Sequence, residues 1–131
     1  MKTLITILLA LTALPLAADE FDRWTWRNPK PLGNGLYSIV HAEEKFVAVG
    51  AYGDLLSSPD GKEWTTHASP TTKRFLGVTH GAGLFVAYGR EANLAVSPDG
   101  EHWTAPEHNL VFGIQGMAFG TDIWVLLDEY G

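Results

Sequence analysis

The stretch "SSPDGKEWT" occupies residues 57–65 and returns as "VSPDGEHWT" at residues 96–104. A serine, an aspartate and a nearby histidine, His102, are the residue types of a nucleophilic site. Residues that recur at a fixed spacing are equally typical of a repeated structural unit. The extent of the repetition therefore decides between a fragment of an active site and a structural turn.

The repeat has a period of 39 residues. Residues 36–74 align with residues 75–113 without a gap, and 12 of the 39 positions are identical. Residues 114–131 align as the start of a third copy, and Trp24-Thr25 lies 40 residues before Trp64-Thr65. A period of about 40 residues is typical of a protein built from stacked structural repeats.

Each copy is predicted to contain four short strands. In the first copy the apolar runs between Gly, Pro and Asp breaks predict strands at 36–41, 45–50, 54–58 and 63–67. Four antiparallel strands per repeat favour an all-β fold, a segment of a β-propeller with about 2.5 blades. A β-sandwich is the alternative, but a sandwich needs no internal repeat.

The Ser-Pro-Asp-Gly-x-x-Trp motif has a structural role at every position. Proline suits the second position of a turn, aspartate can accept backbone hydrogen bonds, and glycine takes the left-handed conformation. The serine hydroxyl can bond across the turn, and the tryptophan ring can fill the gap between neighbouring blades. The residues predicted to form this structural motif are Ser58, Asp60, Gly61 and Trp64, with Ser97, Asp99, Gly100 and Trp103.

This motif resembles the Asp-box, or BNR repeat, of the sialidase superfamily, and the flanking sequence resembles uncharacterised secreted bacterial propeller proteins. The chain departs from the family pattern because Asp60 and Gly61 are contiguous. The resemblance covers about residues 24–131 and implies a propeller. It implies no catalytic role for the motif, because in this family the box lies at the blade periphery.

The first 18 residues are predicted to be a secretory signal peptide. Lys2 is followed by an apolar run at residues 4–14 and by small residues up to Ala18, which is the pattern of such a segment. The run is shorter than the ~20 residues that span a membrane, and an uncleaved anchor is the alternative. We expect a secreted or periplasmic protein with no membrane span after cleavage. The chain has no cysteine, so no disulfide is expected.

The predicted organisation follows from these features. It comprises a signal peptide (1–18), an N-terminal segment with the last strand of a preceding blade (19–35), two complete repeats (36–74 and 75–113) and a partial repeat (114–131). Propellers usually close with 4–8 blades. The chain is therefore predicted either to be a fragment of a longer protein or to associate with itself through open blade edges.

Composition and spacing exclude several function classes. The formal net charge of −6 lacks the basic footprint that nucleic acid binding requires. No metal-ligand spacing such as HExxH occurs, so no metal and no cofactor are expected. A sialidase would need an arginine cluster and the Arg-Ile-Pro element; the nearest match, Arg74-Phe75-Leu76, departs from it, and no catalytic residue carries over.

The predicted function is that of a secreted binding or scaffold module for a protein or glycan ligand, and not of an enzyme. Candidate ligand-facing loops join the strands at residues 42–44, 51–53, 81–83 and 90–92, where Tyr52, Arg90 and Glu91 have the side chains best suited to recognition. The alternative is a portion of a sialidase-like or other glycoside hydrolase whose catalytic residues lie outside this chain. A third interpretation is an assembly factor for a membrane complex.

Overall fold

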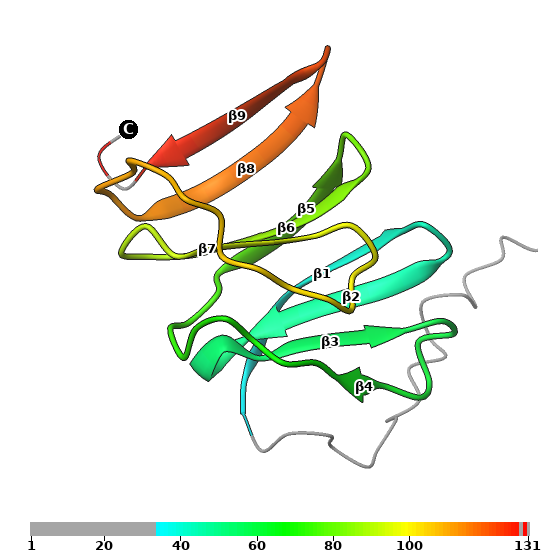
Figure 1. The fold of residues 1–131 in the computed structure, drawn as a ribbon. Coiled ribbons are helices and arrows are strands. Elements are labelled where there is room, and N and C mark those ends of the chain that lie inside the picture. The colour runs from blue at the N-terminus through cyan, green and yellow to red at the C-terminus, as the bar shows by residue number, and fades with distance from the viewer. Residues whose placement is uncertain (1–33, 129, 131) are drawn as a thin grey trace, which may run out of the picture.

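The computed structural model describes residues 34–128 and residue 130, which form antiparallel sheets joined by short turns (Figure 1). The predicted signal peptide and the Trp24-Thr25 element lie outside the described residues. The prediction of an all-β chain without a regular α-helix is confirmed, and the one helical element in the described part is the 3-10 turn η2 (Ala51–Gly53).

Three sheets follow one another along the chain. The first contains β1 (Leu36–Ala42), β2 (Lys45–Gly50), β3 (Leu55–Ser58) and β4 (Thr65–Thr66). The second contains β5 (Gly77–Gly81), β6 (Leu84–Tyr88) and β7 (Leu94–Ser97), and the third contains β8 (Ile114–Gly120) and β9 (Ile123–Asp128). In every sheet the spatial order of the strands is the chain order, and none of the sheets closes on itself. Figure 1 shows the sheets stacked in sequence, from β1–β4 to β8–β9.

The strands agree with the predicted ranges except at the fourth position of each repeat. β4 has two residues instead of the five predicted at 63–67, and in the second repeat a single bridge between Val96 and Thr104 takes its place. The reason lies in the preceding turn. Asp60 Oδ1 accepts the backbone N–H groups of Lys62 (2.8 Å) and Glu63 (3.2 Å), so these amides are unavailable to a strand.

The first hairpin of each sheet has the same two-residue turn. Strand pairing ends at Ala42↔Lys45, Gly81↔Leu84 and Gly120↔Ile123. The intervening residues all have positive φ: Glu43 and Glu44, Ala82 and Gly83, and Thr121 and Asp122. Positive φ at both central residues defines a type I′ turn, whose twist suits a hairpin. The three sheets therefore begin with equivalent hairpins although their turn sequences differ.

The main core lies between the first and second sheets. Val47, Val49 and Leu55 from the first sheet pack with Phe85 and other side chains of the second. The remaining members of this buried cluster are Phe75, Val78, Ala87, Ala95 and Trp103. Residues on alternate positions of a strand face the same side of a sheet. The forward face of the first sheet therefore packs on the backward face of the second, where forward means toward the next sheet in the chain.

Backbone hydrogen bonds also join consecutive sheets at equivalent positions. The Phe75 N–H donates to the Gly50 carbonyl (3.0 Å), and 39 residues later the Ile114 N–H donates to the Gly89 carbonyl (2.9 Å). A Cβ at Gly50 would collide with the carbonyl oxygen of Gly35, and a Cβ at Gly89 with that of Arg74. Glycine is required at these two positions because the backbone of a neighbouring segment passes against it.

The two Ser-Pro-Asp-Gly turns have the same hydrogen bonds. In the second turn the buried Ser97 Oγ accepts the Gly100 N–H (2.8 Å), while Asp99 Oδ1 accepts the N–H groups of Glu101 (2.9 Å) and His102 (2.8 Å). The Ser97 hydroxyl also donates to Asp99 Oδ1 (3.0 Å). These bonds hold the pKa of Asp99 well below its usual range, the backbone N–H of His102 contributing most.

The first turn repeats this arrangement. Ser58 Oγ accepts the Gly61 N–H (2.8 Å), and its hydroxyl donates to Asp60 Oδ1 (3.2 Å). Gly61 and Gly100 have φ values of 69° and 75°, the left-handed region in which only glycine is unstrained. Because Ser58 and Ser97 are fully buried and bonded within their turns, their hydroxyls are structural groups and not accessible nucleophiles.

The two tryptophans of the repeat differ in their surroundings. Trp103 is buried in the core between the first and second sheets, and its indole N–H donates to the Gly100 carbonyl (3.2 Å). Trp64 is half-buried. Lys45 of β2 further ties the second turn to the first sheet, since its ammonium donates to the Asp99 carbonyl (2.8 Å) and to the Glu101 carboxylate (2.8 Å).

Asp99→Asn is expected to make stability less dependent on pH in the acid range. A carboxyl whose pKa is lowered by folding stabilises the protein above its unfolded pKa, and that stabilisation is lost as the pH falls toward the folded pKa. Melting temperatures measured from neutral pH down to about pH 2 should therefore fall less for Asp99→Asn than for the unmodified protein. Glu107→Gln, at an exposed carboxylate, should keep the original slope; a common slope for all three proteins would contradict the assignment.

Candidate functional site

The loops that join the strands lie at two opposite ends of the sheets. The hairpin end carries the type I′ turns and both Ser-Pro-Asp-Gly turns, because Phe46 at the start of β2 pairs with Ser58 at the end of β3. The loop end carries η2, the equivalent turn at residues 89–93, and the segments that enter β5 and β8. Of the four predicted loops, those at 51–53 and 90–92 lie at the loop end, and those at 42–44 and 81–83 lie at the hairpin end.

The three residues predicted to face a ligand all lie at the loop end. Tyr52 and Glu91 occupy equivalent positions of the repeat, and both are exposed in the left-handed conformation, with φ values of 57° and 56°. Arg90 immediately precedes Glu91 and is also exposed. Non-glycine residues in this region of φ/ψ space are strained and tend to cluster at functional sites. The structure therefore brings the predicted residues to one end of the molecule.

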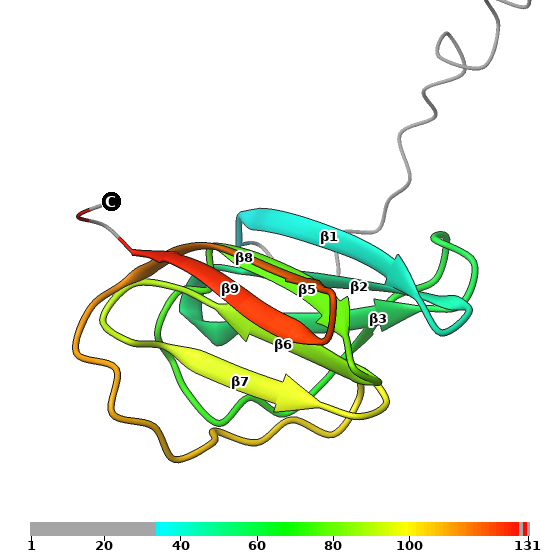
Figure 2. The ribbon, with the colours of Figure 1, turned by 90° about the horizontal axis from the view of Figure 1, so that it is seen from above.

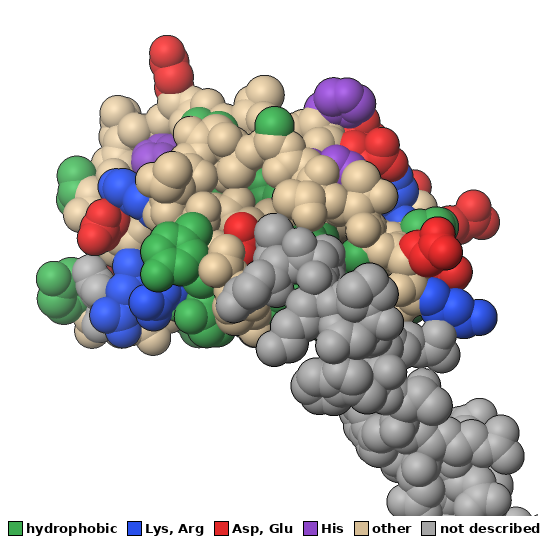
Figure 3. Space-filling view, turned by 90° about the horizontal axis from the view of Figure 1, so that it is seen from below, with side chains coloured by type: hydrophobic (Ala, Val, Ile, Leu, Met, Phe, Trp, Pro, Cys, Tyr) green, Lys and Arg blue, Asp and Glu red, His purple; other side chains and the backbone are tan. Residues whose placement is uncertain are grey.

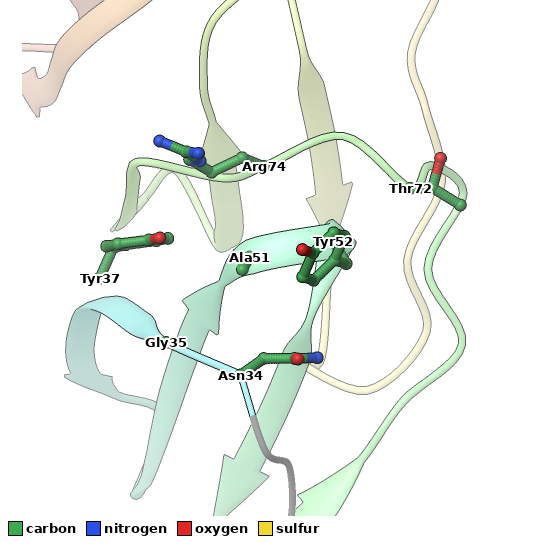
Figure 4. Close-up of a pocket in the computed structure, with 7 residues that line it drawn as sticks. All are labelled: Asn34, Gly35, Tyr37, Ala51, Tyr52, Thr72 and Arg74. Atoms are coloured by element: carbon green, nitrogen blue, oxygen red, sulfur yellow. The ribbon is translucent and has the colours of Figure 1, made fainter.

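An open cavity of about 530 Å³ lies beside Tyr52. Its lining comes from three segments far apart in the sequence: the start of β1, η2 and the segment before β5 (Figure 4). The lining residues are Asn34, Gly35, Tyr37, Ala51, Tyr52, Thr72 and Arg74. Volumes of this order are typical of small-molecule sites. We refer to this cavity as the loop-end groove.

Arg74 and Tyr37 form a pair at one side of the groove. The Arg74 guanidinium lies 5.5 Å from the centre of the Tyr37 ring, within the range of a cation–π interaction. Figure 4 shows the Arg74 side chain extending above the Tyr37 ring, with Asn34 and Tyr52 farther along the groove. Among the described residues Arg74 has no carboxylate partner, so its N–H groups are free to bind an acceptor.

A second, smaller cavity adjoins the groove. It measures about 270 Å³ and is lined by Lys73, Arg74, Arg90 and Glu91. Glu91 pairs with the Lys73 ammonium at 3.2 Å, which leaves the two guanidinium groups as the unpaired cations of its lining. Figure 3 shows Lys and Arg side chains gathered beside hydrophobic ones on the left, where the loops lie, and several Asp and Glu side chains on the right.

Sequence reasoning missed part of this site. Tyr37 and Arg74 lie 37 residues apart, at the start of one repeat and at the end of the same repeat. Neither residue recurs at the equivalent position of the second repeat, where Leu76 and Gly113 stand. That departure from the repeat is a signal which could have identified both residues.

A second departure from the repeat lies in the first sheet. Ser57 Oγ and His67 Nε2 are 2.7 Å apart, and the equivalent positions hold Val96 and Pro106. Burial lowers the pKa of His67, so the neutral ring that can accept from the hydroxyl is favoured. Ser57 is 7% exposed and lies within β3, so a substrate would not reach its oxygen. The pair is a bond between β3 and the end of β4.

The histidines of the repeat serve packing. The rings of His41 and Phe46 lie 4.5 Å apart, and those of the equivalent His80 and Phe85 lie 4.6 Å apart. The third sheet has two other aromatic residues at the same positions, with ring centres 4.9 Å apart. Within residues 34–128 and residue 130, no three His, Asp or Glu side chains gather as ligands for a metal ion.

Comparisons with known proteins leave the sequence resemblance as it stands. No protein-family model matches the chain, and no curated protein matches it with significance. In the described part of the chain, no helix has the length and apolar character to cross a membrane.

Proposed function

We propose that this chain is a segment of a β-propeller built from Asp-box repeats, and that it acts as a secreted binding module for a protein or glycan ligand. The 39-residue repeat, the stacked antiparallel sheets and the recurring turn support the propeller interpretation. Secretion rests on the sequence pattern of residues 1–18. The sheets are then blades, and the loop end is one face of the propeller.

The observation that carries the binding role is the loop-end groove. Two exposed tyrosines, Tyr37 and Tyr52, offer amphipathic rings of the kind enriched at binding surfaces. Arg74 adds unpaired N–H donors, and Asn34 adds an amide already oriented by its bond to Asp54 Oδ2 (3.0 Å). Aromatic surface beside a few fixed polar groups is the composition of a recognition site. No acid–base or nucleophilic pair lines the groove, so binding is the chemistry that its residues support.

A binding screen tests this proposal. The purified protein is labelled and applied to a glycan array and to a panel of extracellular proteins, and hits are measured by calorimetry. We expect Arg74→Ala and Tyr52→Ala each to weaken binding about tenfold or more, a loss of at least ~1.4 kcal/mol.

Lys62→Ala is the matched control, because Lys62 is an exposed cation at the hairpin end. It should bind as the unmodified protein does. Equal affinities for all variants, or loss confined to Lys62→Ala, would contradict the assignment of the groove.

A further inference from the structure

The forward face of the third sheet is apolar and exposed. Ile123, Val125 and Leu127 alternate along β9 and are 57%, 52% and 64% exposed. Val125 and Leu127 occupy the positions of Val47 and Val49 in the repeat, which are fully buried against the second sheet. Figure 2 shows β9 from above with no described element over it. A face that is core in the first sheet is therefore surface in the third.

The backward face of the first sheet shows the opposite half of the same contact. Ile39 is 57% exposed, whereas its equivalent in the second sheet, Val78, is 7% exposed and packs in the core. Phe46 is half-buried, and its equivalent, Phe85, is fully buried. The two ends of the stack thus expose the two complementary faces that the chain joins internally.

We propose that a second copy of this chain docks on the third sheet through the backward face of its first sheet. The contact continues the internal packing, in which a forward face covers the backward face of the next sheet. Burying contiguous apolar surface of this kind is the main driving force for association. A contact between two different faces is head-to-tail, and it gives a closed ring when the rotation between copies allows closure.

The number of copies follows from the proposed propeller geometry, and this step rests on that proposal. Each copy supplies three sheets, and propellers close with 4–8 blades. Two copies give six blades, within that range, and three copies give nine, outside it. The expected assembly is a closed dimer with two identical contacts. Asp128 stands where Gly50 and Gly89 stand in the other sheets, so the new contact rests on the apolar faces and not on the close backbone approach.

Sedimentation velocity and light scattering on the purified full chain test the proposal. The unmodified protein should have twice the mass that mass spectrometry gives for the single polypeptide. Val125→Asp and Ile39→Lys, one on each face, should each abolish the dimer and leave a monomer with unchanged far-UV circular dichroism. The double variant Val125→Asp/Ile39→Lys should recover the dimer, because the introduced aspartate of one copy then faces the introduced lysine of the other.

Val111→Asp is the matched control, since Val111 is exposed on neither face but in the segment before β8. It should remain a dimer. A monomeric unmodified protein, or a dimer that persists in both single-face variants, would overturn the docking proposal. A defined assembly of three or more copies that the face variants abolish would overturn the dimer and count against the six-blade geometry, whereas the ligand-binding assay tests the groove separately.

Discussion

Trp103→Ala is expected to lower the free energy of unfolding by about 3–5 kcal/mol, the range typical of a buried tryptophan replaced by alanine. The ring is buried between the first and second sheets, where it packs with side chains from both. Its removal leaves a cavity in that interface and also deletes the indole bond to the Gly100 carbonyl. The loss should therefore loosen the contact between the sheets and not only the turn.

Urea denaturation of Trp103→Ala and Trp64→Ala provides the measurement. Trp64 occupies the equivalent position but is half-buried, so its replacement should cost less. A loss for Trp103→Ala within the ~0.5 kcal/mol of ordinary surface substitutions would contradict the packing assigned to this ring.

Gly89→Ala should be the most harmful single methyl group added to the chain. The new Cβ would collide with the Arg74 carbonyl oxygen, which is backbone and has no rotamer into which to move. The clash would also displace the Gly89 carbonyl from the Ile114 N–H and so disturb the contact between the second and third sheets. Overpacking and one lost hydrogen bond together correspond to about 2–4 kcal/mol.

Gly120→Ala is the control for this prediction. A Cβ at Gly120 would meet nothing within 4 Å, and the residue precedes the β8–β9 turn in extended backbone. Its melting temperature should match that of the unmodified protein. If Gly89→Ala were equally stable, the close passage of the two segments would be wrong.

Repeat arithmetic predicted most of the strands because local sequence determines them. The range 45–50 was predicted as observed, and the strand at 54–58 was displaced by one residue. The fourth strands were overestimated, since the carboxylates of Asp60 and Asp99 capture the amides that would have begun them. That competition between side chain and ladder is invisible in a pattern of apolar residues.

The site was only partly predictable for a related reason. Tyr52, Arg90 and Glu91 could be selected because they stand in breaks between strands. The stacking of Arg74 on Tyr37 depends on how the chain returns after four strands, which no local pattern encodes. The shared end of the loops follows from the antiparallel order of the sheets, and this order also separates the candidates at 42–44 and 81–83 from the groove.

The order of stacking has a consequence for how the molecule is made. Strand contacts join the first sheet to the second and the second to the third, so each layer needs only the layer synthesised before it. Such a chain can be built vectorially, with each new hairpin condensing on a finished template as it emerges. Pulling from the carboxyl terminus should then peel the layers away in reverse order, as a series of separate force steps.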